Sequence, residues 1–292
     1  MSVVAPPSDT RQAAPSAGRL RRAVSRGNLL IGSLLIGLIG AVALLSLVWT
    51  PLPPGKLQIV QKLKPPLMQG LLGTDHLGRD VASMLMVGAW NSLSIAVLAV
   101  AMGAFAGTLV GVTVAARRGW FEAIMMRAND VIFALPPILS AMMLGALLGT
   151  GRRTAIIAIA VFMVPVFARV TVSAALQVWS RDYVLAARGA GKGGIRITVD
   201  HVLPNIANQI TVQVTIQLGL AILTEAGLSF LGLGMAPPAP TWGRMLADAQ
   251  TYLGRAPWLA ILPGLAIALT VLGFNMLGDG LRDLLDPREK GR

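Results

Sequence analysis

The chain has 292 residues, of which 54% are hydrophobic and only 13% are charged, about half the charged fraction of a typical soluble domain. The absence of cysteine excludes disulfides and cysteine-ligated metal sites, and the presence of only two histidines, His76 and His201, argues against a histidine-based metal centre. In a soluble protein the net charge of +12 would suggest nucleic-acid binding, whereas in a membrane protein Lys and Arg collect in cytoplasmic loops. We therefore expect an all-α, polytopic membrane protein that contacts lipid and binds no nucleic acid.

The first apolar stretch covers residues 29–49, contains no charge and follows an arginine-rich segment. It is longer than the apolar region of a signal peptide, and apolar residues continue past the small residues at 41–43. The sequence therefore predicts an uncleaved first transmembrane helix at 28–50. The basic segment before it, 1–27, is rich in Ala, Pro and Ser towards its start and is expected to be a disordered tail.

Five more apolar stretches follow an external segment at 51–88 and make up a core domain at 89–292. We expect their helices at about 92–116, 131–150, 154–179, 202–233 and 258–277. Small residues in the second span favour close helix contact, and Pro136-Pro137 should kink or break the third span. Six spans place both termini on one side of the membrane. Lys and Arg are more numerous on that side, which predicts that both termini are cytoplasmic.

A cytoplasmic loop at 180–201 separates the fourth and fifth predicted spans. Its alanines and leucine favour a short helix, its glycines end that helix, and a proline begins the next span. On residue type alone, the loop could equally be a solvated basic turn. Three groups of residues resemble, in type and spacing, the EAA loop of type I ATP-binding-cassette importer permeases: Ala186-Ala187, Gly191 and Leu203-Pro204.

In that family the loop docks into the ATPase subunit and transmits its closing motion. The resemblance therefore assigns ATPase coupling to nine residues: Tyr183, Leu185, Ala186, Ala187, Arg188, Gly189, Ala190, Gly191 and Lys192. Leu185 stands where the family has glutamate, so this chain lacks the family's carboxylate at the ATPase contact. The stretch is not a phosphate-binding loop, which would need glycine at position 186 and Ser or Thr after Lys192.

Two external segments resemble signatures of the C-type permease subunit of dipeptide, oligopeptide and nickel importers. Residues 73–80 match the pattern GTDxxGRD, and residues 225–243 match the pattern EAxLSFLGLGxxPPxPxWG. The segment 272–283 is similar to the closing segment of the same subunit, so the resemblance covers about residues 70–290. The resemblance implies a functional role in the external loops for five residues: Asp75, Gly78, Arg79, Asp80 and Trp242.

These external residues also have a purely structural interpretation. Thr74 or Asp75 is expected to cap a helix, with Asp80 near its positive end. Trp242 is expected at the membrane interface, where tryptophan is enriched. A capped helix entering the membrane therefore stands as an alternative to a direct role in handling solute.

Polar residues recur within the fifth predicted span. Gln209, Gln213 and Gln217 share one helical face, and Asn205 continues the row. They line a translocation path or hydrogen-bond to neighbouring helices, and both interpretations stay open. Glu225 lies further along the span; because a carboxylate at mid-membrane costs about 2.5–3.5 kcal/mol, we expect a partner or a wet cavity for it, and a structural hydrogen bond is the favoured role.

Two other pairings were considered from the sequence. Arg127 and Asp130, three residues apart, are expected to form an ion pair at the cytoplasmic start of the third span. Ser229 and His201 invite comparison with a membrane-embedded hydrolase. They lie about 40 Å apart along one helix at 1.5 Å per residue, which excludes a catalytic dyad within that helix.

The resemblance implies a non-catalytic permease subunit of an ATP-driven importer of peptides or related small solutes in the bacterial inner membrane. The implied partners are a homologous permease subunit, two cytoplasmic ATPase subunits or one fused ATPase, and an extracytoplasmic solute-binding protein. No cofactor is expected on this chain, since ATP and Mg would be bound by the ATPase subunits. The alternative is an ion-coupled secondary transporter, which would need coupling carboxylates at mid-membrane and usually an internal repeat. Glu225 is the sole candidate carboxylate, and the solute stays open among peptides, nickel chelates and haem.

Overall fold

The computed structural model describes residues 16–285 and is helical over most of that range, with an isolated bridge between Thr74 and Asp80 and no strand. The long helices are α1 (Ser16–Leu45), α2 (Val81–Ala116), α3 (Trp120–Ala134), α4 (Pro137–Leu148), α5 (Arg152–Trp179), α8 (Leu203–Phe230) and α10 (Trp258–Leu285). The short elements are η1 (Ile59–Gln61), α6 (Asp182–Gly189), α7 (Gly194–Ile197), the π-helical turn η2 (Thr198–Val202), α9 (Trp242–Ala249) and η3 (Gln250–Tyr252).

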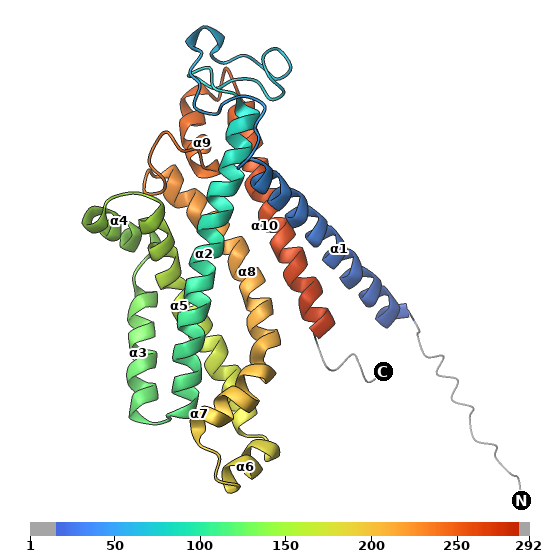
Figure 1. Ribbon diagram of the computed structural model, residues 1–292, viewed down its shortest axis with the longest axis vertical. Helices are drawn as coiled ribbons and strands as arrows, with labels where there is room; N and C mark the ends of the chain where they lie inside the picture. Colours follow the sequence, from blue (N-terminus) through green and yellow to red (C-terminus); the bar gives the residue numbers. More distant parts are fainter. Residues whose placement is uncertain (1–15, 286–292) are drawn as a thin grey trace, which may run out of the picture.

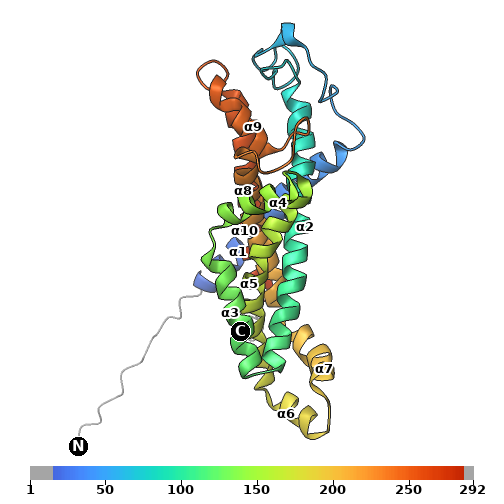
Figure 2. The same ribbon diagram turned by 90° about the vertical axis from the view of Figure 1, so that its left-hand side faces the viewer.

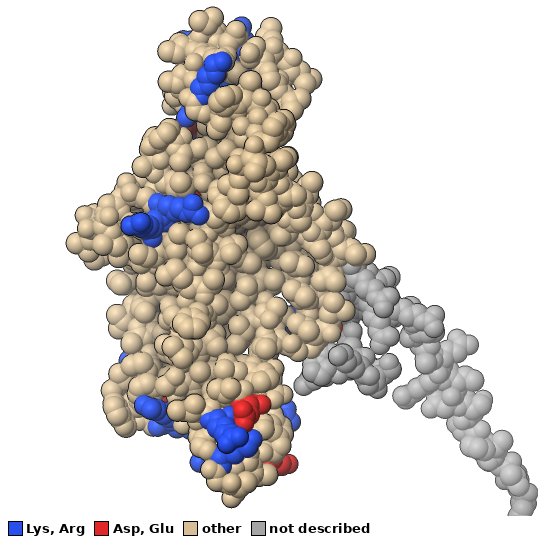
Figure 3. Space-filling model, in the orientation of Figure 1, with Lys and Arg blue, Asp and Glu red and all other residues tan. Residues whose placement is uncertain are grey.

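The long helices form an elongated bundle with a distinct segment at each end. Figure 1 shows α9 and the segment before α2 at one end, and α6 and α7 at the other. In the view turned by 90°, α6 projects beyond the ends of α2, α3 and α5 (Figure 2). The space-filling view shows Lys and Arg gathered towards the two ends of this face, with one further basic patch between them (Figure 3). The long stretch of this face between that patch and the α6 end is nearly free of Lys and Arg, which matches a surface that lies in hydrocarbon.

Within the described residues, five helices are long and apolar enough to cross a membrane, and α3 with α4 makes a sixth if this bent pair is one span. The pair bends by 90° between Ala134 and Ile138. The break falls at Pro136 and Pro137, because proline has no backbone N–H to donate to the preceding turn. The predicted all-α fold and the predicted interruption of the third span are both confirmed.

Several boundaries differ from the sequence-based expectation. Helix α1 already begins at Ser16, so residues 16–27 are helical rather than part of a disordered tail, and it ends at Leu45 rather than at 50. The Ala, Arg and Leu residues before the first apolar stretch are good helix formers, which explains the early start. The rest of the predicted tail, 1–15, lies outside the described residues. Helix α2 begins at Val81, so residues 81–88 of the segment predicted to be external are helical.

Helices α2 and α5 pack closely because α2 places glycines on one face at every fourth position. A Cβ atom at Gly103 would collide with the Met163 side chain. One at Gly107 would lie 2.5 Å from the carbonyl oxygen of Val164, and one at Gly111 would lie 2.5 Å from Cβ of Thr171. Glycine removes these clashes and lets the two backbones approach, which confirms the expected role of the small residues in this span.

Helix α1 packs along α10, again through glycines. A Cβ atom at Gly32 would lie 2.6 Å from the backbone nitrogen of Leu277, and one at Gly280 would lie 2.8 Å from Cβ of Leu29. A main apolar cluster joins α2, α5, α8, α9 and α10. A second, smaller cluster lies at the α6 end and joins that end of α2, α5 and α8 to α6 and α7.

Replacing Gly107 with alanine should lower the free energy of unfolding by about 1–3 kcal/mol, because the new methyl group overpacks the contact with α5. Thermal denaturation of the purified protein measures the change. Gly37→Ala in α1 is the matched control, since nothing lies within 4 Å of a Cβ at Gly37. Equal stability of the two variants would show that the α2–α5 contact does not depend on glycine.

Candidate functional site

The short helix α6 ends in a glycine-dependent cap. The N–H of Lys192 donates to the carbonyl of Ala187 (3.0 Å), and the N–H of Gly191 donates to the carbonyl of Arg188 (2.9 Å). Gly191 has φ +83°, the left-handed conformation that this pair of hydrogen bonds requires. These are the features of a Schellman motif, in which glycine avoids the steric cost that a Cβ would add. The glycine predicted to end the helix therefore has a defined backbone role.

One side of α6 is fixed to the bundle and the other is exposed. Val184 is fully buried in the second apolar cluster, and so is Ile197 of α7. Tyr183 and Leu185 are about half exposed, at 47% and 51%. The remaining predicted coupling residues are exposed, except for two that are half-buried, Ala187 and Lys192. The structure thus brings the nine predicted residues onto one projecting element with an apolar outer face.

Ionic contacts join the end of α6 to the base of α8. Nζ of Lys192 lies 3.1 Å from Oδ2 of Asp200 and 3.3 Å from Nε2 of His201. The ring of His201 also meets the ring of Tyr183 edge-on, with 6.0 Å between their centroids. Arg196 approaches Asp200 at 3.6 Å. Because these groups are substantially exposed, each ion pair contributes little stability alone, and the apolar cluster holds the loop in place.

The polar row on α8 changes from exposed to buried along the helix. Asn205 and Gln209 are exposed and line a cavity of about 530 Å³ beside Tyr183. Gln213 is half-buried, and Gln217 is buried, with 5% of its surface exposed. The inner half of the row therefore faces open space next to α6, whereas Gln217 faces the protein interior.

Glu225 is fully buried, so the predicted path residue lies inside the protein. The hydroxyl of Ser229 donates to its Oε1 at 2.6 Å, which confirms the favoured structural hydrogen bond. The hydroxyls of Ser92 and Thr241 lie beside the same carboxyl group. Each of these two oxygens also accepts a backbone N–H, Ser92 from Trp242 (3.3 Å) and Thr241 from Arg244 (3.2 Å). Glu225 thus lies where α8, α2 and the start of α9 meet.

The segment 73–80 forms a tight turn before α2. Oδ1 of Asp75 accepts the backbone N–H groups of Leu77 (2.9 Å) and Arg79 (2.7 Å), and Oδ2 accepts Nε of Arg79 at 2.7 Å. Gly78 has φ +74°, and a Cβ there would collide with the carbonyl of Gln58. The three residues therefore fix the shape of the turn.

Asp80, rather than Thr74 or Asp75, caps α2. Its carboxylate accepts the backbone N–H of Ser83 at 2.8 Å and the hydroxyl of Ser83 at 2.6 Å. The hydroxyl of Thr74 instead contacts the carbonyl of Gln61. The prediction that Thr74 or Asp75 caps the helix is wrong, because the turn at Gly78 delays the helix start until after Asp80.

The sequence suggested that Trp242 lies at the membrane interface. In the structure its side chain is instead buried, with 2% of its surface exposed. Its indole N–H donates to the carbonyl of Leu85 at 3.2 Å, and its ring packs where α2 has Gly88. Nearby, the side-chain amide of Asn91 donates to the carbonyl of Pro240 at 2.7 Å. Sequence reasoning overlooked Asn91 and Ser92; an adjacent polar pair in an apolar helix was the available signal.

The two external signatures meet on one surface. Arg79 lies 3.8 Å from Asp248 of α9, and Arg244 lies 3.1 Å from the same carboxylate. The ring of His76 stacks on Tyr252 at 5.2 Å between centroids. Residues about 170 positions apart therefore form one folded platform at the end of the bundle opposite α6, built from the turn at 73–80 and α9.

Asp130 pairs with a different residue from the one predicted. Nη2 of Arg169 in α5 lies 2.5 Å from Oδ1 of Asp130, and the same guanidinium lies 4.5 Å from the centre of the Phe133 ring. The expected Arg127–Asp130 pair is wrong, because α3 packs against α5 and brings a tertiary partner within reach.

The fold defines a class: a polytopic helical membrane protein with the short helix α6 projecting at one end and a folded platform at the other. The chain belongs to the family of binding-protein-dependent transport system inner membrane components, whose model matches residues 103–291. It is a non-catalytic permease subunit of an ATP-binding-cassette importer, a multi-pass inner-membrane protein that works with ATPase and binding-protein components.

Relatives of known name agree with this assignment. The chain is 45% identical over 226 residues to the glutathione transport system permease protein GsiD of Escherichia coli O6:K15:H31 (strain 536), covering 77% of this chain and 75% of the relative. The same values hold for GsiD of Shigella boydii serotype 4 (strain Sb227). An inward-facing structure of the MetNI methionine ABC transporter matches the fold with a TM-score of 0.59 at 18% identity, covering 70% of this chain and 96% of that one.

Replacing Glu225 with leucine should lower the free energy of unfolding by about 1–3 kcal/mol, because the Ser229 hydroxyl loses its buried acceptor. Glu225→Gln keeps an acceptor oxygen and nearly the same shape, so it is expected to retain most of the stability. Thermal denaturation of both purified variants tests this. A leucine variant as stable as the wild type would contradict a structural role for the carboxyl group.

Proposed function

We propose that this subunit imports short peptides or peptide-like thiols of the glutathione type, driven by ATPase subunits that dock on α6. The observation that carries the docking is the contrast between the two sides of α6, with Val184 fully buried and Leu185 half exposed. The solute class is supported by the 45% identity to a glutathione transport permease. Arrival of an ATPase on the exposed side would push on an element that is fixed to the ends of α2, α5 and α8.

The wider assembly follows from the family and from the two ends of the bundle. A homologous permease subunit would pair with this chain as a heterodimer, and two ATPase subunits, or one fused ATPase, would dock below. ATP and Mg would be bound by those subunits and not by this chain. The external platform of Asp75, Arg79 and Asp248 would receive the solute-binding protein, since it is the folded surface opposite α6.

The termini are proposed to lie in the cytoplasm. Helix α1 begins and α10 ends towards the α6 end of the bundle (Figure 1). That end carries a set of basic residues that includes Arg117, Arg118, Arg181, Arg188 and Arg196, as the positive-inside rule requires of a cytoplasmic side.

The inner part of the path is proposed to run past Asn205 and Gln209, which line the cavity of about 530 Å³ beside α6. Their amides would hydrogen-bond to peptide groups of a passing solute. Glu225, which is fully buried, is not part of this path.

Replacing Gly191 with valine should reduce the solute transported per ATP hydrolysed by about tenfold, since a β-branched residue in the left-handed conformation costs roughly 1–2 kcal/mol and distorts the end of α6. Transport and ATP hydrolysis are measured together in proteoliposomes of the complete importer. Gly193→Val is the matched control, because Gly193 has φ −70° and no atom within 4 Å of its Cβ position. Equal loss in both variants would indicate general sensitivity of the loop and refute the cap's role.

Deleting the subunit should abolish uptake of radiolabelled glutathione and dipeptides, and expressing it again should restore that uptake. Purification of the chain from its native membrane should bring ATPase subunits with it. Retained peptide uptake in the deletion strain, together with lost uptake of a nickel chelate or haem, would overturn the solute class. Transport by the purified chain without any ATPase would overturn the importer mechanism itself.

A further inference from the structure

A cavity of about 560 Å³ lies on the membrane side of the coupling helix. It is lined by the inner ends of α2 and α5, by the turn between α2 and α3, and by α6 and α7. The basic residues Arg118, Arg188 and Lys192 line it, together with Trp179 and Ser180, and no Asp or Glu does. Its volume falls within the range of small-molecule sites. Arg188 and Lys192 also belong to the predicted ATPase-coupling loop, but the coupling role uses the exposed side of α6 and assigns no ligand to the cavity.

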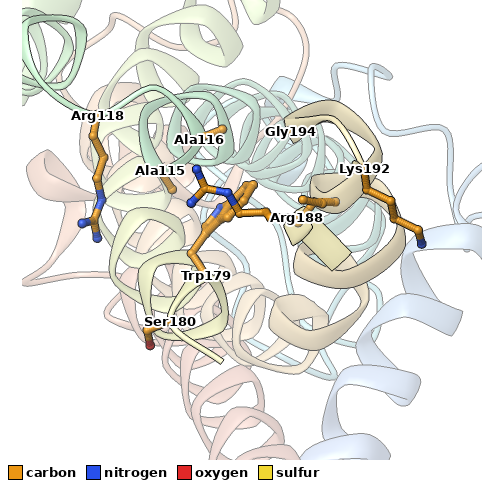
Figure 4. Close-up of a pocket in the computed structure, with 9 residues that line it drawn as sticks. Ala115, Ala116, Arg118, Trp179, Ser180, Arg188, Lys192 and Gly194 are labelled. Carbon is orange, nitrogen blue, oxygen red and sulfur yellow. The ribbon is translucent and has the colours of Figure 1, made fainter. Parts of the chain in front are cut away.

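Two of the three cations are free to bind a ligand. Lys192 is engaged by Asp200, and in Figure 4 its ammonium group points away from the other lining residues. Arg118 and Arg188 make no ion pair or side-chain hydrogen bond with any part of the described chain, 16–285. The guanidinium of Arg188 points towards the middle of the lining residues (Figure 4). Two unneutralised guanidinium groups on one cavity attract an anion.

Trp179 adds an aromatic wall to the same cavity. Its indole nitrogen is buried and has no hydrogen-bond partner in the structure, although a buried N–H normally finds one. Ser180, beside it, has an exposed side chain. The charged groups that a ligand meets here are therefore the two guanidinium groups, which suit the several oxygens of a phosphate group.

We propose that this cavity binds a phosphate group, held by Arg118 and Arg188. An anionic phospholipid headgroup and soluble phosphate share this chemistry. The position favours the headgroup, because the cavity lies where the apolar parts of α2 and α5 end and basic residues begin. Basic pockets at the cytoplasmic ends of transmembrane helices are a recurrent arrangement for anionic lipid headgroups.

The bound phosphate would join two parts of the chain that are otherwise separate. Arg118 lies in the turn after α2, and Arg188 lies on α6. A group that neutralises both would brace the coupling helix against the end of α2, so that anionic lipid would strengthen the response of the bundle to the ATPase. Binding itself does not depend on the proposed transport function; only this effect on coupling rests on it.

The first test measures lipid retained by the importer, purified with its partner subunits from membranes that contain phosphatidylglycerol. Native mass spectrometry compares the wild type with the double variant Arg118→Gln, Arg188→Gln. Loss of two basic groups near an anionic headgroup should reduce retention by roughly 30-fold. The control Arg117→Gln, Arg181→Gln changes the net charge equally but lies outside the cavity lining, and it should retain the lipid. Arg118→Lys, Arg188→Lys, which keeps both charges, should retain most of it.

A second measurement separates the sources of phosphate. The importer is placed in nanodiscs of phosphatidylcholine alone, and its melting temperature is followed as inorganic phosphate is added. A rise in the wild type that is absent from the glutamine double variant would support the site and assign it to soluble phosphate. Retention and phosphate response that are equal in the wild type and the double variant would overturn the proposal.

A third outcome concerns the ATPase. If the double variant loses its ATPase subunits on purification while lipid retention stays unchanged, the two arginines would belong to the docking surface and the proposed anion site would be refuted. The transport assays described above measure solute uptake, whereas these tests measure retained lipid and melting temperature. A negative result for the lipid site would therefore not contradict the proposed importer function.

Discussion

Helix α8 contacts other elements at both of its ends, α6 at one end and α2 and α9 at the other. These two sets of contacts determine how far the two ends of the bundle can move relative to each other. At the inner end, Ile206 lies in the apolar cluster that also holds Val184 of α6. At the outer end, Glu225 accepts the hydroxyl of Ser229 and lies beside hydroxyls from α2 and the start of α9. Both residues belong to one continuous helix of 28 residues, about 42 Å long at 1.5 Å per residue. A displacement of α6 therefore carries the outer segment with it.

The two sets of contacts differ in kind. The inner one is an apolar cluster with exposed ion pairs around it, and apolar contact has no strong directional preference. The outer one consists of the buried Glu225 carboxyl group beside the Ser92 and Thr241 hydroxyls and of Gly243 in α9 packed against the backbone of Ala226 in α8. The inner end can therefore shift its packing in small steps, whereas the close backbone contact at the outer end leaves room for few other arrangements. This difference suits a permease that alternates between two states.

Features set by local chemistry could be predicted from the sequence, and features set by tertiary neighbours could not. Proline at 136 and 137 has no N–H, so the interruption of the third span followed from residue type. A glycine end to the short helix α6 also followed from residue type, because glycine alone takes a φ such as the +83° of Gly191 without strain. In contrast, Asp130 pairs with Arg169, a partner 39 positions away. Trp242 is buried only because α2 offers Gly88 opposite its ring.

The leucine at position 185 changes the physics of the proposed ATPase contact. Glutamate at this place would form a contact that depends on charge and weakens as salt screens it. Leu185 and Tyr183 instead offer apolar surface on the exposed side of α6, and burying it yields about 25 cal/mol for each Å² removed from water. Such a contact resists high ionic strength but places fewer demands on orientation than a charged pair. Orientation must then come from elsewhere, and the rigid Schellman cap at Gly191, the Lys192–Asp200 pair and the buried Val184 supply it within this chain.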